Sequence, residues 1–65
     1  MLDYRLSEDQ LVALKAAHRG TRDKREADRI KAVVLLGSGW TAGQVAEALM
    51  IDENTVRNHF KRYRQ

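Results

Sequence analysis

The sequence predicts an all-α protein, a compact bundle of about four short helices that forms a single domain over residues 1–65. Apolar residues recur every three or four positions in four successive segments, which is the spacing of one helical face. A Ser, Thr or Asp residue stands before each segment, where it can cap a helix. Proline is absent, and three of the four glycines lie between the segments. An apolar fraction of 43% favours a folded core over a disordered chain.

The first helix is predicted to begin after Ser7, because Gln10 lies three residues further on and completes a capping box. Glu8 and Asp9 also favour the positive end of the helix dipole. Gly20 is expected to end the helix. The face that should pack against the rest of the domain carries Leu11, Leu14 and His18.

The second helix is predicted to begin after Thr21 or Asp23, where Asp23 and Glu26 repeat the capping pattern. The helix is predicted to run through Ala27, Ile30, Val33 and Val34, and to end there or at Leu36. The glycine-rich corner at residues 37–39 should stop the helix and allow a large change of direction. Trp40 follows this corner, and we expect it to fill a gap in the core rather than to stack on a base.

Residues 41–64 predict a helix-turn-helix unit, in which two short helices are joined by a tight turn. Thr41 and Gln44 form a second capping box, and Asp52 is placed to cap the last helix. The last helix should pack through an apolar stripe at positions i, i+4 and i+7, made of Val56, Phe60 and Tyr63. The preceding helix should contribute Val45, Ala46 and Leu49, and Ile51 should flank the turn.

Met50 occupies a critical position in this turn. It lies four residues after Ala46, the small residue expected where the two helices approach each other. Turns of this kind tend toward a positive φ at that position, which would cost a methionine roughly 1–2 kcal/mol. The sequence predicts either this strained conformation or a slightly different turn.

The outward face of the last helix carries the candidate binding residues. At about 100° per residue, the side chains opposite the apolar stripe belong to Asn54, Asn58, Lys61 and Gln65. Asn pairs with adenine and Lys with guanine, so we expect Asn54, Asn58 and Lys61 to reach base edges in the major groove of double-stranded DNA. Side chains flanking this face are better placed for phosphates. A second basic group near residue 22 could equally add a phosphate contact or only solvate the corner between the first two helices. These predicted phosphate contacts are Thr55, Arg57, Arg62, Arg22 and Arg25.

A basic helix face is often only a solvated surface, but from Arg57 to the end this chain carries four basic residues and no acidic one. That asymmetry, directly after a turn of the right length, favours nucleic acid. Cysteine is absent, and the two histidines, His18 and His59, lie too far apart to suggest a metal site. No carboxylate cluster or phosphate-cradling loop is evident. We therefore expect no catalysis, cofactor, metal or small-molecule substrate.

The run from Leu6 to Gln65 resembles the N-terminal helix-turn-helix region of mariner-like transposases from bacterial insertion sequences. The most specific segments are DRIKAVVLLGSGWTAGQVAEAL and DENTVRNHFKRY. The resemblance implies a homeodomain-like fold that binds terminal inverted repeats, with catalysis carried out by a separate ribonuclease-H-like domain whose catalytic residues have no counterparts here. It implies DNA contacts for Asn54, Thr55, Arg57, Asn58, Lys61 and Arg62.

Three functions are compatible with these patterns: a transposase DNA-binding domain, a small stand-alone transcriptional regulator that uses the same surface, and a helix-turn-helix module for protein assembly. No apolar run reaches the length of about 20 residues that a membrane span needs, and no secretion signal is present, so we expect a soluble protein. The resemblance places it in the bacterial cytoplasm, at the nucleoid. A core of this size is marginal by itself, which makes a homodimer plausible.

Overall fold

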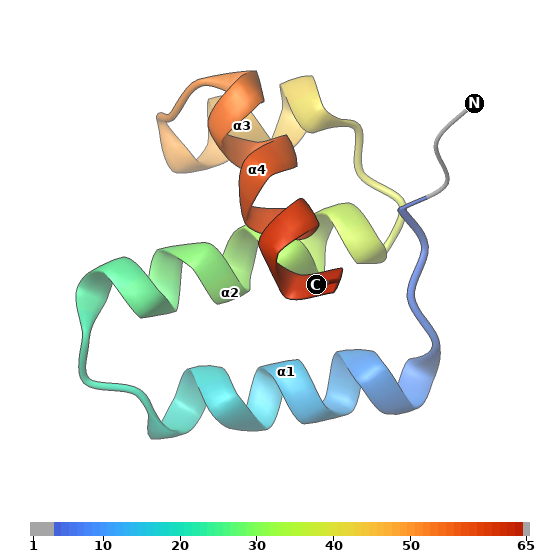
Figure 1. Cartoon of the computed structure of the whole chain (residues 1–65), viewed down its shortest axis with the longest axis vertical. Coiled ribbons are helices and arrows are strands. Elements are labelled where there is room, and N and C mark those ends of the chain that lie inside the picture. Colours follow the sequence, from blue (N-terminus) through green and yellow to red (C-terminus); the bar gives the residue numbers. More distant parts are fainter. Residues whose placement is uncertain (1–3, 65) are drawn as a thin grey trace.

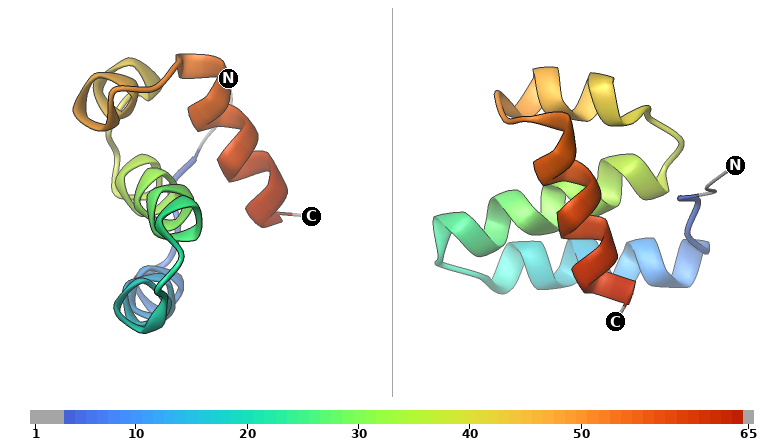
Figure 2. Two further views of the ribbon diagram at one scale, coloured as in Figure 1. Left: turned by 90° about the vertical axis from the view of Figure 1, so that its left-hand side faces the viewer. Right: turned by 45° about the horizontal axis from the view of Figure 1, so that its top comes forward.

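The computed structural model describes residues 4–64, which form four helices and, within that range, no strand. The helices are α1 (Glu8–Gly20), α2 (Lys24–Gly37), α3 (Ala42–Leu49) and α4 (Glu53–Arg64). Figure 1 shows α1 and α2 side by side in antiparallel directions, with α3 beyond the far side of α2. In Figure 2, α4 lies on one side of the α1–α2 pair and runs across α2. The predicted all-α bundle of about four helices is confirmed.

Three of the four helices, α1, α2 and α3, begin at the capping side chains that the sequence predicts. Ser7 Oγ accepts a hydrogen bond from the Gln10 backbone N–H at 3.2 Å, and Gln10 Oε1 accepts one from the Ser7 backbone N–H at 3.0 Å. Thr41 and Gln44 repeat this reciprocal arrangement at the start of α3. Asp23 caps α2 by accepting from the Arg25 backbone N–H at 2.9 Å. Each of these side chains satisfies an N–H that the first turn of a helix leaves without a partner.

The turn between α3 and α4 adopts the strained one of the two conformations considered for Met50. This residue has φ 57° and ψ 45°, in the left-handed region. The Ile51 N–H donates to the Ala46 carbonyl at 2.9 Å, and the Met50 N–H donates to the Glu47 carbonyl at 3.3 Å. These two bonds form a Schellman motif, which satisfies the last carbonyls of α3 and turns the chain sharply into α4.

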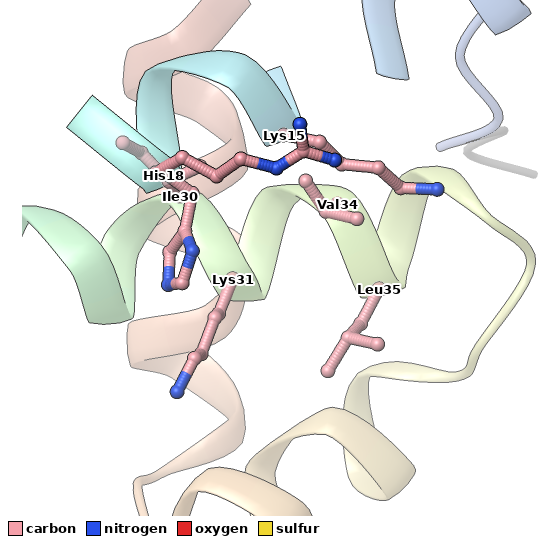
Figure 3. Close-up of a pocket in the computed structure, with 7 residues that line it drawn as sticks. Lys15, His18, Ile30, Lys31, Val34 and Leu35 are labelled. Atoms are coloured by element: carbon pink, nitrogen blue, oxygen red, sulfur yellow. The ribbon is translucent and has the colours of Figure 1, made fainter. Parts of the chain in front are cut away.

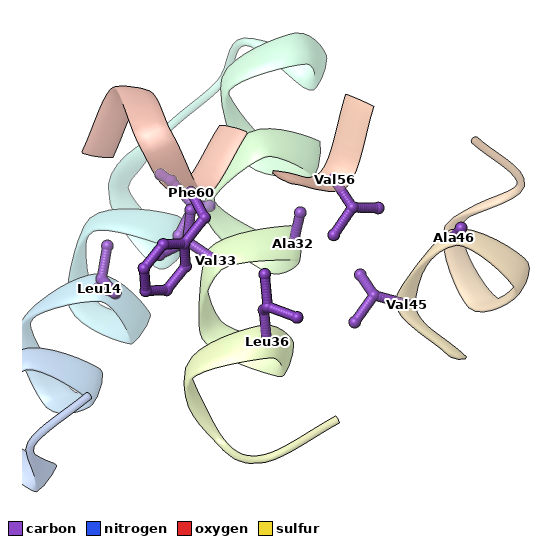
Figure 4. Packing of buried hydrophobic residues seen from close by; sticks show 9 residues of the cluster. Leu14, Ala32, Val33, Leu36, Val45, Ala46, Val56 and Phe60 are labelled. Carbon is purple, nitrogen blue, oxygen red and sulfur yellow. The ribbon is translucent and has the colours of Figure 1, made fainter. Parts of the chain in front are cut away.

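The core lies where α2, α3 and α4 meet (Figure 4). Val33 and Leu36 of α2 are buried together with Val56 and Phe60 of α4 and Val45 of α3. From α1, only Leu14 is buried, and the described part of α1 packs against α2 alone among the helices. The full buried set is Leu14, Ile30, Ala32, Val33, Leu36, Val45, Ala46, Val56 and Phe60. The three C-terminal helices therefore form the main packing unit, and α1 covers the outer side of α2.

The segment before α1 is held against this unit. The Leu6 N–H donates to the Gly37 carbonyl at 3.1 Å. A Cβ atom at Gly37 would lie 2.7 Å from Leu6 Cδ1, so only glycine allows this close approach without a shift. Tyr4 meets Phe60 edge-to-face with ring centroids 5.0 Å apart, which closes one end of the core.

The expectation for Trp40 was wrong, and the expectation for Tyr63 was confirmed only in part. Trp40 does not fill the core: its side chain is 43% exposed and lies beside Gln44 and Glu47 on the outer surface of α3. Tyr63 continues the apolar stripe of α4 by position, but it is 36% exposed. It packs edge-to-face on Phe60, with ring centroids 6.2 Å apart, and it borders a cleft of about 250 Å³ that residues of α1 and α2 also line. Both positions depend on how helices meet in space, which periodicity does not specify.

Across residues 4–64, no helix combines the length and apolar character that a membrane crossing requires.

Candidate nucleic-acid interface

The packing of α4 leaves one of its faces exposed. Val56 and Phe60 are buried against α2 and α3, so the side chains on the opposite side of the helix face solvent. Asn54, Asn58 and Lys61 lie on this outward face and are all exposed, as their spacing predicted. The fourth residue predicted there, Gln65, lies outside the described residues. We call the set Asn54, Asn58 and Lys61 the outward face of α4.

Arg57 interacts with this face within α4 itself. Its Nη2 donates a hydrogen bond of 2.8 Å to the Asn54 Oδ1 atom. The amide oxygen keeps a second lone pair, and the amide nitrogen keeps both of its hydrogens, so the bond fixes the orientation of the Asn54 side chain without consuming its capacity to pair with a base. Arg57 is therefore placed to orient Asn54 as well as to carry charge.

On the other flank of the outward face, Arg62 is exposed and Thr55 is half-buried. Arg62 borders a hollow of about 450 Å³ together with Asn58, His59 and Lys61. Two of these four side chains carry a fixed positive charge, and none is acidic. The only acidic residue of α4 is Glu53 in its first turn, so positive charge dominates the remainder of the helix.

The surroundings of His59 alter its titration. Partial burial lowers the pKa of His59 below its ordinary value of 6.5, because it disfavours the charged imidazolium. The guanidinium groups of Arg29 and Arg62 lower the pKa further, while the Asp28 carboxylate acts in the opposite direction. The neutral imidazole is therefore the predominant form at pH 7 in the free protein, and the fixed charge of the hollow comes from Lys61 and Arg62.

Arg22 and Arg25 lie elsewhere in the molecule. Arg22 belongs to the turn between α1 and α2, and Arg25 to the first turn of α2; both side chains are exposed. This turn is at the end of the α1–α2 pair that lies away from the corner between α2 and α3 (Figure 1). The structure thus gathers six of the eight predicted contact residues on α4 and leaves these two on a separate element.

Sequence reasoning did not identify Tyr4 as a neighbour of this surface. Its ring packs on Phe60, and it borders a hollow of about 370 Å³ that Arg57, Asn58 and Lys61 also line. Arg64 completes the border, with its guanidinium carbon 5.6 Å from the centroid of the Phe60 ring. The segment before Ser7 shows no helical periodicity, so the aromatic residue itself was the only signal that could have indicated this contact.

The arrangement of α2, α3 and α4 defines a helix-turn-helix domain. A tight turn, with Met50 in the left-handed conformation, joins α3 to α4, and α4 lies across α2 with one face exposed. The sequence model of the homeodomain-like domain family matches residues 23–65, so the chain belongs to this family. No curated protein and no solved structure matches the chain. Family membership indicates binding of double-stranded DNA, and small domains of this kind are generally non-catalytic. Helix α1 lies before the matched residues.

Proposed function

We propose that this domain binds double-stranded DNA sequence-specifically by placing α4 in the major groove. The observation that carries the proposal is the composition of α4: its buried stripe fixes the helix to the domain, and the opposite face presents two amides and a lysine with no carboxylate beyond the first turn. An α-helix fits the major groove, where each base pair presents a distinct pattern of donors and acceptors. Asn54, Asn58 and Lys61 would read base edges.

The flanking residues would hold the phosphate backbones on either side. Arg57 and Arg62 lie on opposite flanks of the outward face, and the Thr55 hydroxyl lies near the start of α4. Arg22 and Arg25 would add a phosphate contact from the separate α1–α2 turn. Phosphate contacts fix the position of the domain without reading sequence. A module of this size buries on the order of 600–1,000 Å² on DNA, so tight binding requires a second copy or a further domain.

We further propose that the DNA target is the terminal inverted repeat of a mobile element. The support is the resemblance of residues 28–49 and 52–63 to the DNA-binding region of mariner-like transposases. The same outward face would serve a stand-alone transcriptional regulator equally well, and the two functions differ in the sequence that is bound. A helix-turn-helix used for protein assembly would bind no DNA with steep salt dependence.

The test is selection of binding sites from a random-sequence DNA pool, followed by titration of the best site and a scrambled site at several salt concentrations. A DNA reader yields an enriched motif and an affinity that falls with salt, with a slope of about −0.9 for each phosphate neutralised. A motif that matches an element's terminal repeat supports the transposase proposal, whereas a promoter motif supports a regulator. Absence of both enrichment and salt dependence would refute DNA binding.

The division of roles is tested by two matched alanine variants on α4. We expect Asn58→Ala to reduce discrimination between the best and scrambled sites, because it removes an amide from the outward face. Arg62→Ala should weaken all sequences alike and reduce the salt slope by about one unit, because it removes a phosphate contact. If both variants lost the same affinity on every sequence, the assignment of Asn58 to bases and Arg62 to phosphates would be wrong.

A further inference from the structure

A second surface lies between α1 and α2. It is a groove of about 380 Å³ (Figure 3), which we call the α1–α2 groove. Ile30, Val34 and Leu35 of α2 form its apolar floor. Lys15 and Arg19 of α1 and Lys31 of α2 supply three positive charges around that floor, and His18 is the remaining lining residue.

This groove faces away from the proposed DNA interface. At about 100° per residue, Lys31, Val34 and Leu35 lie on the side of α2 opposite Val33 and Leu36, which are buried with the apolar stripe of α4. Figure 2 shows α4 on one side of the α1–α2 pair, and in Figure 3 it lies behind α2. One straight duplex held by α4 therefore does not reach the groove.

The chemistry of the groove differs from that of a phosphate-binding surface. Its floor is apolar: Ile30 is buried, and Val34 and Leu35 pack against the core but remain half-buried. Phosphates would leave these aliphatic side chains in contact with water, whereas an apolar ligand face would remove them from it. The rim carries only positive charge, since no lining residue is a carboxylate. A complementary ligand thus combines apolar side chains with flanking acidic groups.

We propose that the α1–α2 groove docks an acidic amphipathic helix of a partner protein. Apolar side chains of that helix, spaced at i, i+4 and i+7, would cover Ile30, Val34 and Leu35, as amphipathic helices do in hydrophobic grooves. Its flanking Glu or Asp side chains would meet Lys15, Arg19 and Lys31. Because the groove lies on the face opposite α4, docking leaves the proposed DNA interface open. One wall of the groove is α1, which lies before the residues that match the homeodomain-like family.

The test uses the full chain without DNA, so its result does not depend on the proposed DNA binding. Two labelled peptides of about 20 residues, long enough to form a helix, share the same apolar positions. One carries Glu and the other Lys at every flanking position. We expect only the acidic peptide to bind. In an NMR titration with that peptide, the amide signals of Lys31, Val34 and Leu35 should shift, while those of the outward face of α4 should stay unchanged.

Two double variants with equal changes in charge locate the binding. Lys15→Glu with Lys31→Glu should weaken the acidic peptide roughly tenfold, since both lost attractions become repulsions. The matched control, Arg57→Glu with Lys61→Glu on α4, should leave peptide affinity unchanged. All four side chains are exposed, and circular dichroism during thermal unfolding verifies that both variants fold.

Four results would overturn the proposal: neither peptide binds, both peptides bind equally, the two double variants lose the same affinity, or the shifts map to α4. A DNA duplex that shifted the Lys15 and Lys31 amides in place of the acidic peptide would assign the groove to nucleic acid instead.

Discussion

Replacing Met50 by glycine should stabilise the domain. Met50 is the one non-glycine residue with positive φ between residues 4 and 64, and its side chain is 91% exposed. A left-handed conformation costs an L-residue roughly 1–2 kcal/mol, because Cβ crowds the following carbonyl. Glycine removes that cost. It also gives the unfolded chain more conformational entropy, which lowers the free energy of unfolding by about 0.4–1 kcal/mol. When the midpoints of these two ranges are taken, the free energy of unfolding rises by about 0.8 kcal/mol.

For a domain of this size, that gain raises the melting temperature by roughly 3–6 °C. Urea denaturation followed by circular dichroism measures the change in free energy directly, and an unchanged slope m shows that the native and unfolded states stay comparable. Met50→Ala is the matched control: it keeps Cβ, and therefore the strain, while removing an exposed side chain, so its stability should lie within about 0.5 kcal/mol of the original.

Met50→Asn should fall between the two, because asparagine tolerates the left-handed region through local hydrogen bonds and retains its side chain in the unfolded state. If Met50→Gly were no more stable than Met50→Ala, the conclusion that the Schellman turn stores backbone strain at this residue would be refuted. The exposed methionine side chain offers no large packing loss that could mask the gain.

Two further predictions concern α4. Arg57→Lys keeps the positive charge and should keep the salt slope of DNA binding, but it removes the guanidinium that orients Asn54. Discrimination at the base that Asn54 reads, worth about 1–3 kcal/mol for a good bidentate pair, should therefore fall when the best site is compared with its single-base variants. Undiminished discrimination would contradict the orienting role. The pKa of His59 is lower in the folded state than its unfolded value of 6.5. As the pH falls through 6.5, the unfolded chain therefore takes up the proton before the folded one does, and the stability that is fully present above this pH declines. His59→Gln should make the loss of stability between about pH 7 and 5 shallower; an identical pH profile for both proteins would show that His59 is not responsible.

Several features of the fold were readable from adjacent residues. The capping boxes at Ser7 and Thr41 fixed the starts of two helices, because each depends on side-chain and backbone groups three residues apart. The stripe of Val56 and Phe60 identified the buried face of α4, and hence its exposed face, since helical geometry relates the two. These signals are local, so no knowledge of the other helices was needed to use them.

Other features depended on contacts between distant segments. Trp40 and Tyr63 resembled core residues in sequence, yet they are 43% and 36% exposed. The packing of Tyr4 on Phe60 joins residues from opposite ends of the chain. The bond between Arg57 and Asn54 spans only three positions, but periodicity alone placed these residues on a face without indicating that they pair.

By itself, the sequence determined the number and the approximate limits of the helices, the helix-turn-helix unit and the chemical character of the outward face of α4, because these follow from propensity, capping and periodicity along one segment. Only the tertiary structure decided that Met50 takes the left-handed conformation and that α1 forms a cationic groove on the face away from α4. The physical reason is that strain and surface shape arise where segments pack against one another, and that packing is a property of the whole chain.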